Sequence, residues 1–168
     1  MKLILLFTIC AIFVSHYLIY QQVEAENISA ERNLYEEALS ECVNRELKYY
    51  AGTIPESVLK KRIKNRFVEY NESLTEGLST ELGEVTLQYL NMNTLKEKFK
   101  RERREIPILK ILPMQSDGVT IEIEVEDNDF SYKNEKTNYS LKSGCTVRFS
   151  FESEKNQFAL KEVQLWGL

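Results

Sequence analysis

The chain has 168 residues, of which 43% are hydrophobic and 29% are charged, and its formal net charge is −4. This balance is typical of one folded domain, and it excludes a disordered chain and a strongly basic nucleic-acid-binding domain. The single histidine, His16, lies inside the most apolar stretch, so a domain that follows this stretch contains no imidazole. The composition therefore excludes histidine-based catalytic triads and histidine-containing zinc sites from that domain.

Residues Leu3–Tyr20 form an apolar segment, about 27 Å long as a helix, which is near the lower limit for crossing a bilayer. Lys2 precedes the segment and acidic residues follow it, which favours a cytoplasmic amino terminus and an external carboxyl terminus. We therefore expect residues 1–25 to be a single-pass membrane anchor, and residues 26–168 to be one extracytoplasmic domain. The alternative is a signal peptide cleaved after Ala25, which would make the domain a secreted protein.

The chain after this segment is predicted to begin with helices. No glycine or proline occurs before Gly52, so a helix that starts in the apolar segment can continue as a long amphipathic helix to Tyr50. A capping box at Thr53 and a stripe of apolar residues predict a second helix that reaches Tyr70. Residues 94–105 are predicted to form a short helix, capped by Asn93.

The carboxyl-terminal part is predicted to be a β-sheet. Residues 85–90 and 106–113 read as strands, and residues 119–126 and 145–152 alternate between apolar and polar positions. Residues 158–160 and 163–166 suggest a last strand. We expect a turn at Asp117-Gly118, a bulge at Lys161-Glu162 and a mobile polar loop over Asp127–Ser143. The predicted fold class is α+β, with the two long helices first and then an antiparallel β-meander packed on them.

Two cysteines, Cys42 and Cys145, lie outside the apolar segment, both on predicted apolar faces. In an exported chain such a pair predicts a disulfide between the first helix and the sheet. The alternative is a pair of buried free cysteines that act as small apolar residues.

The carboxylates indicate no specific reaction. Residues 126–129 form an acidic cluster that has oxygen ligands for Ca²⁺ but lacks the pattern of an EF-hand loop, so a solvated turn is the simpler interpretation. Glu122, Glu124 and Glu126 share the polar face of one strand, where Arg148 is a cross-strand partner. We expect no catalytic residue, no metal and no cofactor.

A basic cluster occupies the short third helix and the residues just after it. It is either a dock for an acidic partner or a solvated helix face with Glu/Lys pairs. Its members are Lys96, Lys98, Lys100, Arg101, Arg103 and Arg104.

Two further patterns depend on where the chain is made and how it folds. Asn27, Asn71 and Asn138 lie in glycosylation sequons, which matter only in a eukaryotic host. Five aromatic residues are expected to build the core or, in the alternative, to line a ligand cup between helices and sheet: Phe67, Tyr70, Phe149, Phe151 and Trp166.

The layout of residues Leu3–Tyr50, followed by the helix over Lys61–Tyr70 and the sheet, resembles small bitopic proteins of bacterial Tad-type and pilin-like surface assembly systems. The chain lacks the cleaved leader of a prepilin, so the resemblance implies a TadE-like or accessory protein. It implies a structural component of the cell envelope, anchored in the membrane and acting through protein–protein contacts, with itself among its partners. The alternative is a secreted protein that binds a small ligand or a protein in the aromatic cup.

Overall fold

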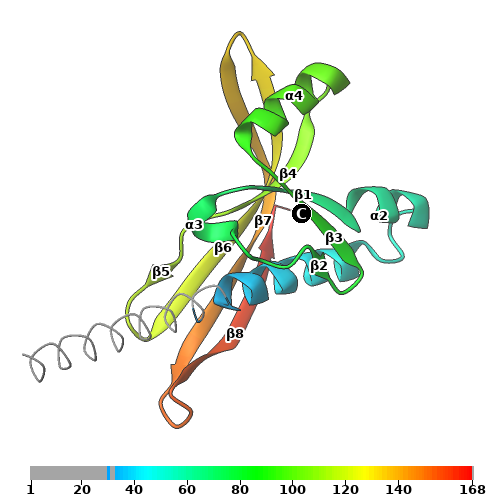
Figure 1. Cartoon of the computed structure of the whole chain (residues 1–168). Coiled ribbons are helices and arrows are strands. Elements are labelled where there is room, and N and C mark those ends of the chain that lie inside the picture. Colours follow the sequence, from blue (N-terminus) through cyan, green and yellow to red (C-terminus); the bar gives the residue numbers. More distant parts are fainter. Residues whose placement is uncertain (1–29, 31–32, 168) are drawn as a thin grey trace, which may run out of the picture. The chain divides into compact units, whose positions relative to one another are not determined.

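A computed structural model describes residue 30 and residues 33–167, and the chain divides into Met1–Leu34 and Tyr35–Leu168. The apolar segment Leu3–Tyr20, the cleavage site after Ala25 and Asn27 lie outside the described residues. The second unit is a mixed α+β fold with a sheet of eight strands (Figure 1). A helix over residues 33–50 is followed by α2 (Glu56–Arg62), β1 (Asn65–Glu69), α3 (Glu72–Thr75), β2 (Glu81–Leu82), β3 (Val85–Leu90), α4 (Met92–Glu102), β4 (Ile106–Ile111), β5 (Gln115–Ser116), β6 (Thr120–Lys133), β7 (Lys136–Glu152) and β8 (Gln157–Trp166).

The sheet is mixed, and the prediction of a purely antiparallel meander is wrong. Its strand order is β2-β3-β1-β4-β6-β7-β8, with β5 paired to β6, and β1 runs parallel to both β3 and β4. Parallel strands need a connection that crosses over the sheet; β3 and β4 lie on either side of β1, and α4 forms the connection between them. The meander is confirmed only for the antiparallel strands β4, β6, β7 and β8.

The predicted second helix ends early. α2 stops at Arg62, and the following residues form β1, where Arg66 and Val68 are buried on one side and Phe67 is half-buried on the other. The predicted capping box is also wrong, because the Thr53 hydroxyl donates to the Tyr50 carbonyl at the end of the preceding helix. Residues 65–69 form a strand and not a helix because they pair with β3 and β4, and in a strand alternate side chains face opposite sides.

The predicted mobile loop over Asp127–Ser143 is instead the upper half of the β6–β7 hairpin. The two strands pair to its tip, where Asn134 and Glu135 both have positive φ, as tight two-residue hairpin turns require. Figure 1 shows α4 lying beside this part of the hairpin. The segment is polar in composition, but its aromatic residues face α4 and form part of a core.

Several local predictions are confirmed. Strands β3 and β4 lie where expected, and the bulge in β8 leaves Lys161 without a partner in β7. The short helix is confirmed as α4, but its predicted cap is wrong: Asn91 and not Asn93 accepts the hydrogen bond from the Thr94 amide. Alternate residues of β6 and β7 are buried: Ile121, Ile123, Val125, Cys145, Val147 and Phe149. The same pattern places Val119 and Phe151 inside, and for these two it is wrong: they are 64% and 39% exposed.

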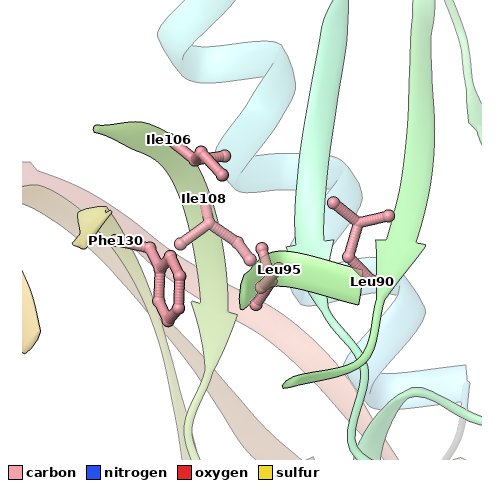
Figure 2. Packing of buried hydrophobic residues seen from close by; sticks show 5 residues of the cluster. All are labelled: Leu90, Leu95, Ile106, Ile108 and Phe130. Carbon is pink, nitrogen blue, oxygen red and sulfur yellow. The ribbon is translucent and has the colours of Figure 1, made fainter. Parts of the chain in front are cut away.

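The sheet carries a core on each face. On the first, which we call the disulfide face, the helix over residues 33–50 buries Tyr35, Ala38, Leu39, Cys42 and Val43. On the second, the α4 face, Leu95 of α4 packs with Leu90, Ile106, Ile108 and Phe130 (Figure 2). Burial of apolar side chains on both faces is the main stabilising contribution.

Candidate interaction surfaces

The helix over residues 33–50 is held on the sheet by a covalent link. Cys42 and Cys145 form a disulfide with a Cα–Cα distance of 5.7 Å, across 103 positions of sequence. The structure thus brings together the two cysteines that the sequence left open as either bonded or free. Closing so long a loop restricts the unfolded chain and stabilises the fold by about 4–5 kcal/mol on a chain-entropy estimate.

A buried arginine forms a second link beside the disulfide. Arg66 of β1 is only 5% exposed, and its Nη1 atom donates to both carboxylate oxygens of Glu46, at 2.8 and 2.9 Å. Its Nη2 atom lies 3.0 Å from Oδ1 of Asp127 on β6. Burial raises the pKa of the Asp127 carboxyl, while the positive charge of Arg66 opposes the rise. Arg66 of β1 therefore forms ion pairs with both the helix over residues 33–50 and β6.

A cavity of about 20 Å³ lies next to these two links, lined by Cys42, Glu46, Asp127 and Cys145 among others. This volume holds about one water molecule and no metabolite. The structure does not gather the five aromatic residues of the predicted ligand cup around it. Phe149 is buried on the disulfide face, Phe67 packs on the α4 face, and Trp166 covers Gly144.

The lysines of the predicted basic cluster lie over aromatic rings. The Lys98 ammonium is 4.5 Å from the ring centre of Phe67, and those of Lys96 and Lys100 are 5.1 and 5.9 Å from Tyr132. Each contact combines cation–π attraction with packing of the aliphatic stem. These three lysines thus help to attach α4 to the sheet.

Three basic groups of the cluster, including Lys98, lie near the carboxylate of Glu102. Its carboxylate lies 2.5 Å from Lys98, 3.0 Å from Arg104 and 3.9 Å from Arg101, and Lys98 and then Arg104 lower its pKa. Arg103 ends the helix in the left-handed conformation, with φ of 54°. Arg101 and Arg104 extend into solvent, so the cluster contains both the predicted ion pairs and exposed guanidinium groups.

Among the acidic residues that the sequence grouped over 122–129, Glu122 and Asp129 pair with basic groups, and Glu126 accepts a hydrogen bond from the Asn128 amide. Arg148 donates to Glu122 at 2.6 Å and to Glu162 at 2.8 Å, and Lys142 lies 3.2 Å from Asp129. Among the residues that the structure describes, no three histidine, cysteine or acidic side chains are placed to hold a metal ion. Asp127 belongs to the Arg66 network, for which the sequence carries no signal because its members are far apart along the chain.

A further polar contact on the α4 face joins β1 and β7. The Tyr139 hydroxyl donates to Glu69 Oε1 at 2.6 Å, and the ammonium of Lys110 lies 5.0 Å from the Tyr139 ring centre. Burial and the bond to Glu69 raise the pKa of the Tyr139 phenol. The sequence carried no signal for this pair, because Glu69 and Tyr139 are far apart along the chain.

Four apolar residues at the lower end of β6, β7 and β8 form what we call the apolar end patch. Its members are Val119, Phe151, Phe158 and Leu160. Val119 is 64% exposed, and Phe151 and Leu160 are each 39% exposed. The patch continues the disulfide face beyond its buried part, as the pairing of Leu160 with the buried Phe149 shows.

Two of the three sequons are within the described residues, and both of their asparagines are exposed. Asn71 caps α3 by accepting a hydrogen bond from the Ser73 amide, and Asn138 lies near the tip of the β6–β7 hairpin. None of the described helices is long and apolar enough to cross a bilayer.

Comparison of the chain with models of protein families, with curated proteins and with solved structures finds no match.

Proposed function

We propose that this protein is a membrane-anchored, extracytoplasmic structural or assembly component of a cell-envelope or pilus-like system, which acts through protein–protein contacts. One observation carries the proposal: the helix that follows the apolar segment is fastened to the sheet by the Cys42–Cys145 disulfide and by buried Arg66. A component that holds partners at a membrane needs a contact surface that is fixed relative to the helix with which the second unit begins.

The disulfide also supports the location outside the cytoplasm. Disulfides persist in oxidising compartments and are rare where thiol reductants are abundant. The same orientation follows from Lys2 before the apolar segment and acidic residues after it.

The exposed guanidinium groups at the end of α4 are the proposed contact surface. Arg101 and Arg104 share a single carboxylate, Glu102, and Lys96, Lys98 and Lys100 hold the helix beneath them. Planar guanidinium groups bind carboxylates with two parallel hydrogen bonds, so this surface suits an acidic partner protein.

Fractionation of cells that express the full chain tests the proposal. We expect the chain to stay in the membrane pellet after a high-salt wash, and to be released by detergent. A matched variant, Ile12→Asp with Val14→Asp, should lose this retention because charge in the apolar segment opposes insertion.

Amino-terminal sequencing of the same material separates the proposal from its alternative. A soluble product that begins at Glu26 would contradict the membrane-anchored role and favour a secreted protein. Intact material in the pellet supports the anchor.

A further inference from the structure

The apolar end patch is one continuous surface across three strands. Thr120 pairs with Ser150, and the Phe151 amide donates to the Val119 carbonyl at 2.8 Å, so Val119 lies opposite Phe151. Phe151 in turn pairs with Phe158, and the centres of their rings are 5.4 Å apart. Exposed apolar residues on adjacent strands indicate a contact surface rather than scattered exposure.

The chain enters the folded unit at the same end of the sheet as the patch. The Tyr35 hydroxyl accepts a hydrogen bond from the Met114 amide at 2.9 Å, and Met114 directly precedes β5. β5 pairs with Glu122 and Ile121 of β6, close to Val119.

Later residues of the helix lie progressively further from the patch. Cys42 bonds to Cys145, which pairs with Val125, and Glu46 reaches Arg66 beside Asp127. The helix therefore runs away from the patch, and Tyr35, the first residue of the second unit, lies at the patch end of the sheet.

Charges near the patch indicate which kind of surface it meets. The Asp117 carboxylate accepts hydrogen bonds from the amides of Val119 and Thr120, at 2.9 and 2.6 Å, which lowers its pKa. Glu152 pairs with Lys155 at 2.7 Å, and Glu154 is exposed. Lys161 directly follows Leu160, so the three acidic groups exceed the two basic ones by one, and an anionic surface would weakly repel this end of the domain.

We propose that the apolar end patch rests in the interfacial region of the bilayer that holds the anchor, among zwitterionic lipid headgroups. The proposal rests on the membrane-anchored function. Because the anchor keeps the domain at the membrane, even a small apolar contact is made repeatedly, without a separate binding step. The patch would then fix the orientation of the domain and direct the α4 surface away from the lipid.

Tryptophan quenching in the full chain tests this orientation. Trp166 is the only tryptophan, so Trp166→Phe gives a silent background into which Val119→Trp or Leu160→Trp is placed. Each variant is reconstituted into phosphatidylcholine vesicles whose acyl chains carry bromine near the headgroup. The matched control is Leu141→Trp, an apolar residue that is 51% exposed in the upper half of β7.

We expect emission from positions 119 and 160 to fall roughly twofold or more in brominated vesicles, because interfacial side chains lie within a few ångström of the quencher. Emission from position 141 should stay unchanged. Mixing phosphatidylglycerol into the vesicles should weaken the quenching at position 119, because the acidic groups beside it are repelled.

Flotation of the same vesicles distinguishes the two levels of the proposal. If the chain does not float with the lipid, the membrane-anchored function fails, and the inference fails with it. If the chain floats but positions 119 and 160 are no more quenched than position 141, the patch does not contact lipid and only the inference is overturned. A blue-shifted but unquenched signal at 119 would assign the patch to a second copy and would also overturn it.

Discussion

Arg66 lies in the interior of the fold although its guanidinium carries a charge at every physiological pH. The bidentate contact with Glu46 and the nearby Asp127 compensate for the loss of water, and the Nε atom has no hydrogen-bond partner among the described residues. Such a network specifies how the helix docks more than it adds net stability, because desolvation offsets much of the attraction.

Replacement of Arg66 should therefore be costly even though the ion pair itself contributes little. We expect Arg66→Met to lower the free energy of unfolding by about 3–5 kcal/mol, because Glu46 is left buried without a partner. Urea-induced unfolding measures the change. Arg148→Met is the control: that arginine is half-exposed, and its loss should cost less than about 1 kcal/mol.

A third variant identifies the cause. Adding Glu46→Gln to Arg66→Met should recover part of the loss, because the uncompensated charge is gone. If Arg66→Met and Arg148→Met lower the free energy of unfolding by the same amount, the role assigned to Arg66 is wrong.

We expect the fold to lose stability at alkaline pH because of two partly buried tyrosines, Tyr89 and Tyr139. Burial raises the pKa of Tyr89 to about 12, and burial and Glu69 raise the pKa of Tyr139, whereas both phenols have ordinary values near 10 in the unfolded chain. Above pH 10 the unfolded state has lost these protons and the folded state retains them, so unfolding is favoured as pH rises. Each group contributes up to about 1.4 kcal/mol per pH unit.

Urea unfolding between pH 8 and pH 12 measures this slope. Tyr89→Phe should flatten the decline, since phenylalanine cannot ionise, at the cost of the hydrogen bond from Tyr89 to the Ser79 carbonyl. A slope that is unchanged in this variant would show that Tyr89 is not one of the groups responsible.

Among the elements, α4 has the largest number of roles. It is the crossover between β3 and β4, it covers one face of the sheet, and it presents Arg101 and Arg104 to solvent. Because α4 packs on the sheet, not all charges of the basic cluster are exposed to solvent. Three of its lysines lie over the rings of Phe67 and Tyr132.

The packing between β7 and β8 depends on a missing side chain. A Cβ atom at Gly144 would overlap the ring of Trp166, whose Nε1 donates to the Thr146 hydroxyl at 3.1 Å. Gly144→Ala should displace the ring, shift the tryptophan emission to longer wavelength and lower stability by about 1–3 kcal/mol.

The double variant Gly144→Ala with Trp166→Leu tests this explanation by unfolding measurements. Its loss should be smaller than the sum of the two single losses, because leucine leaves room for the new methyl group. Additive losses would mean that the overlap is relieved elsewhere.

The sequence predicted elements well where one period was unambiguous. Strict alternation in β6 and β7 identified most of the buried residues, and two adjacent charged residues in the last strand indicated the bulge at Lys161. The helix prediction for residues 63–70 was wrong because Ile63, Phe67 and Tyr70 also fit the spacing of a helical stripe. Only the pairing of β1 with β3, which is distant in sequence, decides between helix and strand here. The charged network was equally hidden, because Glu46, Arg66 and Asp127 meet only in the folded chain.

At the scale of the whole molecule, the disulfide links the first described helix to β7, near the end of the chain. The residues between Cys42 and Cys145 include most of the sheet and all of α4, so the link encloses most of the fold. Reduction should thus affect global unfolding and not a local segment.

Counting thiols checks the link directly. The chain has three cysteines, so the denatured chain should react with one maleimide before reduction and with three afterwards. The double variant Cys42→Ser with Cys145→Ser should lose about 4–5 kcal/mol in urea unfolding, as the loop-closure estimate requires. Three reactive thiols without reductant would contradict the disulfide.

The bulge at Lys161 has a consequence for copies of the chain that meet edge to edge. β8 forms the long outer edge of the described sheet, and an exposed edge strand can pair with a strand of another copy. Repeated pairing of uninterrupted edges is how fibrils grow. The break in the middle of β8, with a lysine at the break, interrupts the regular hydrogen-bonding row that such growth requires. Copies can therefore come together through their side chains without fusing their sheets.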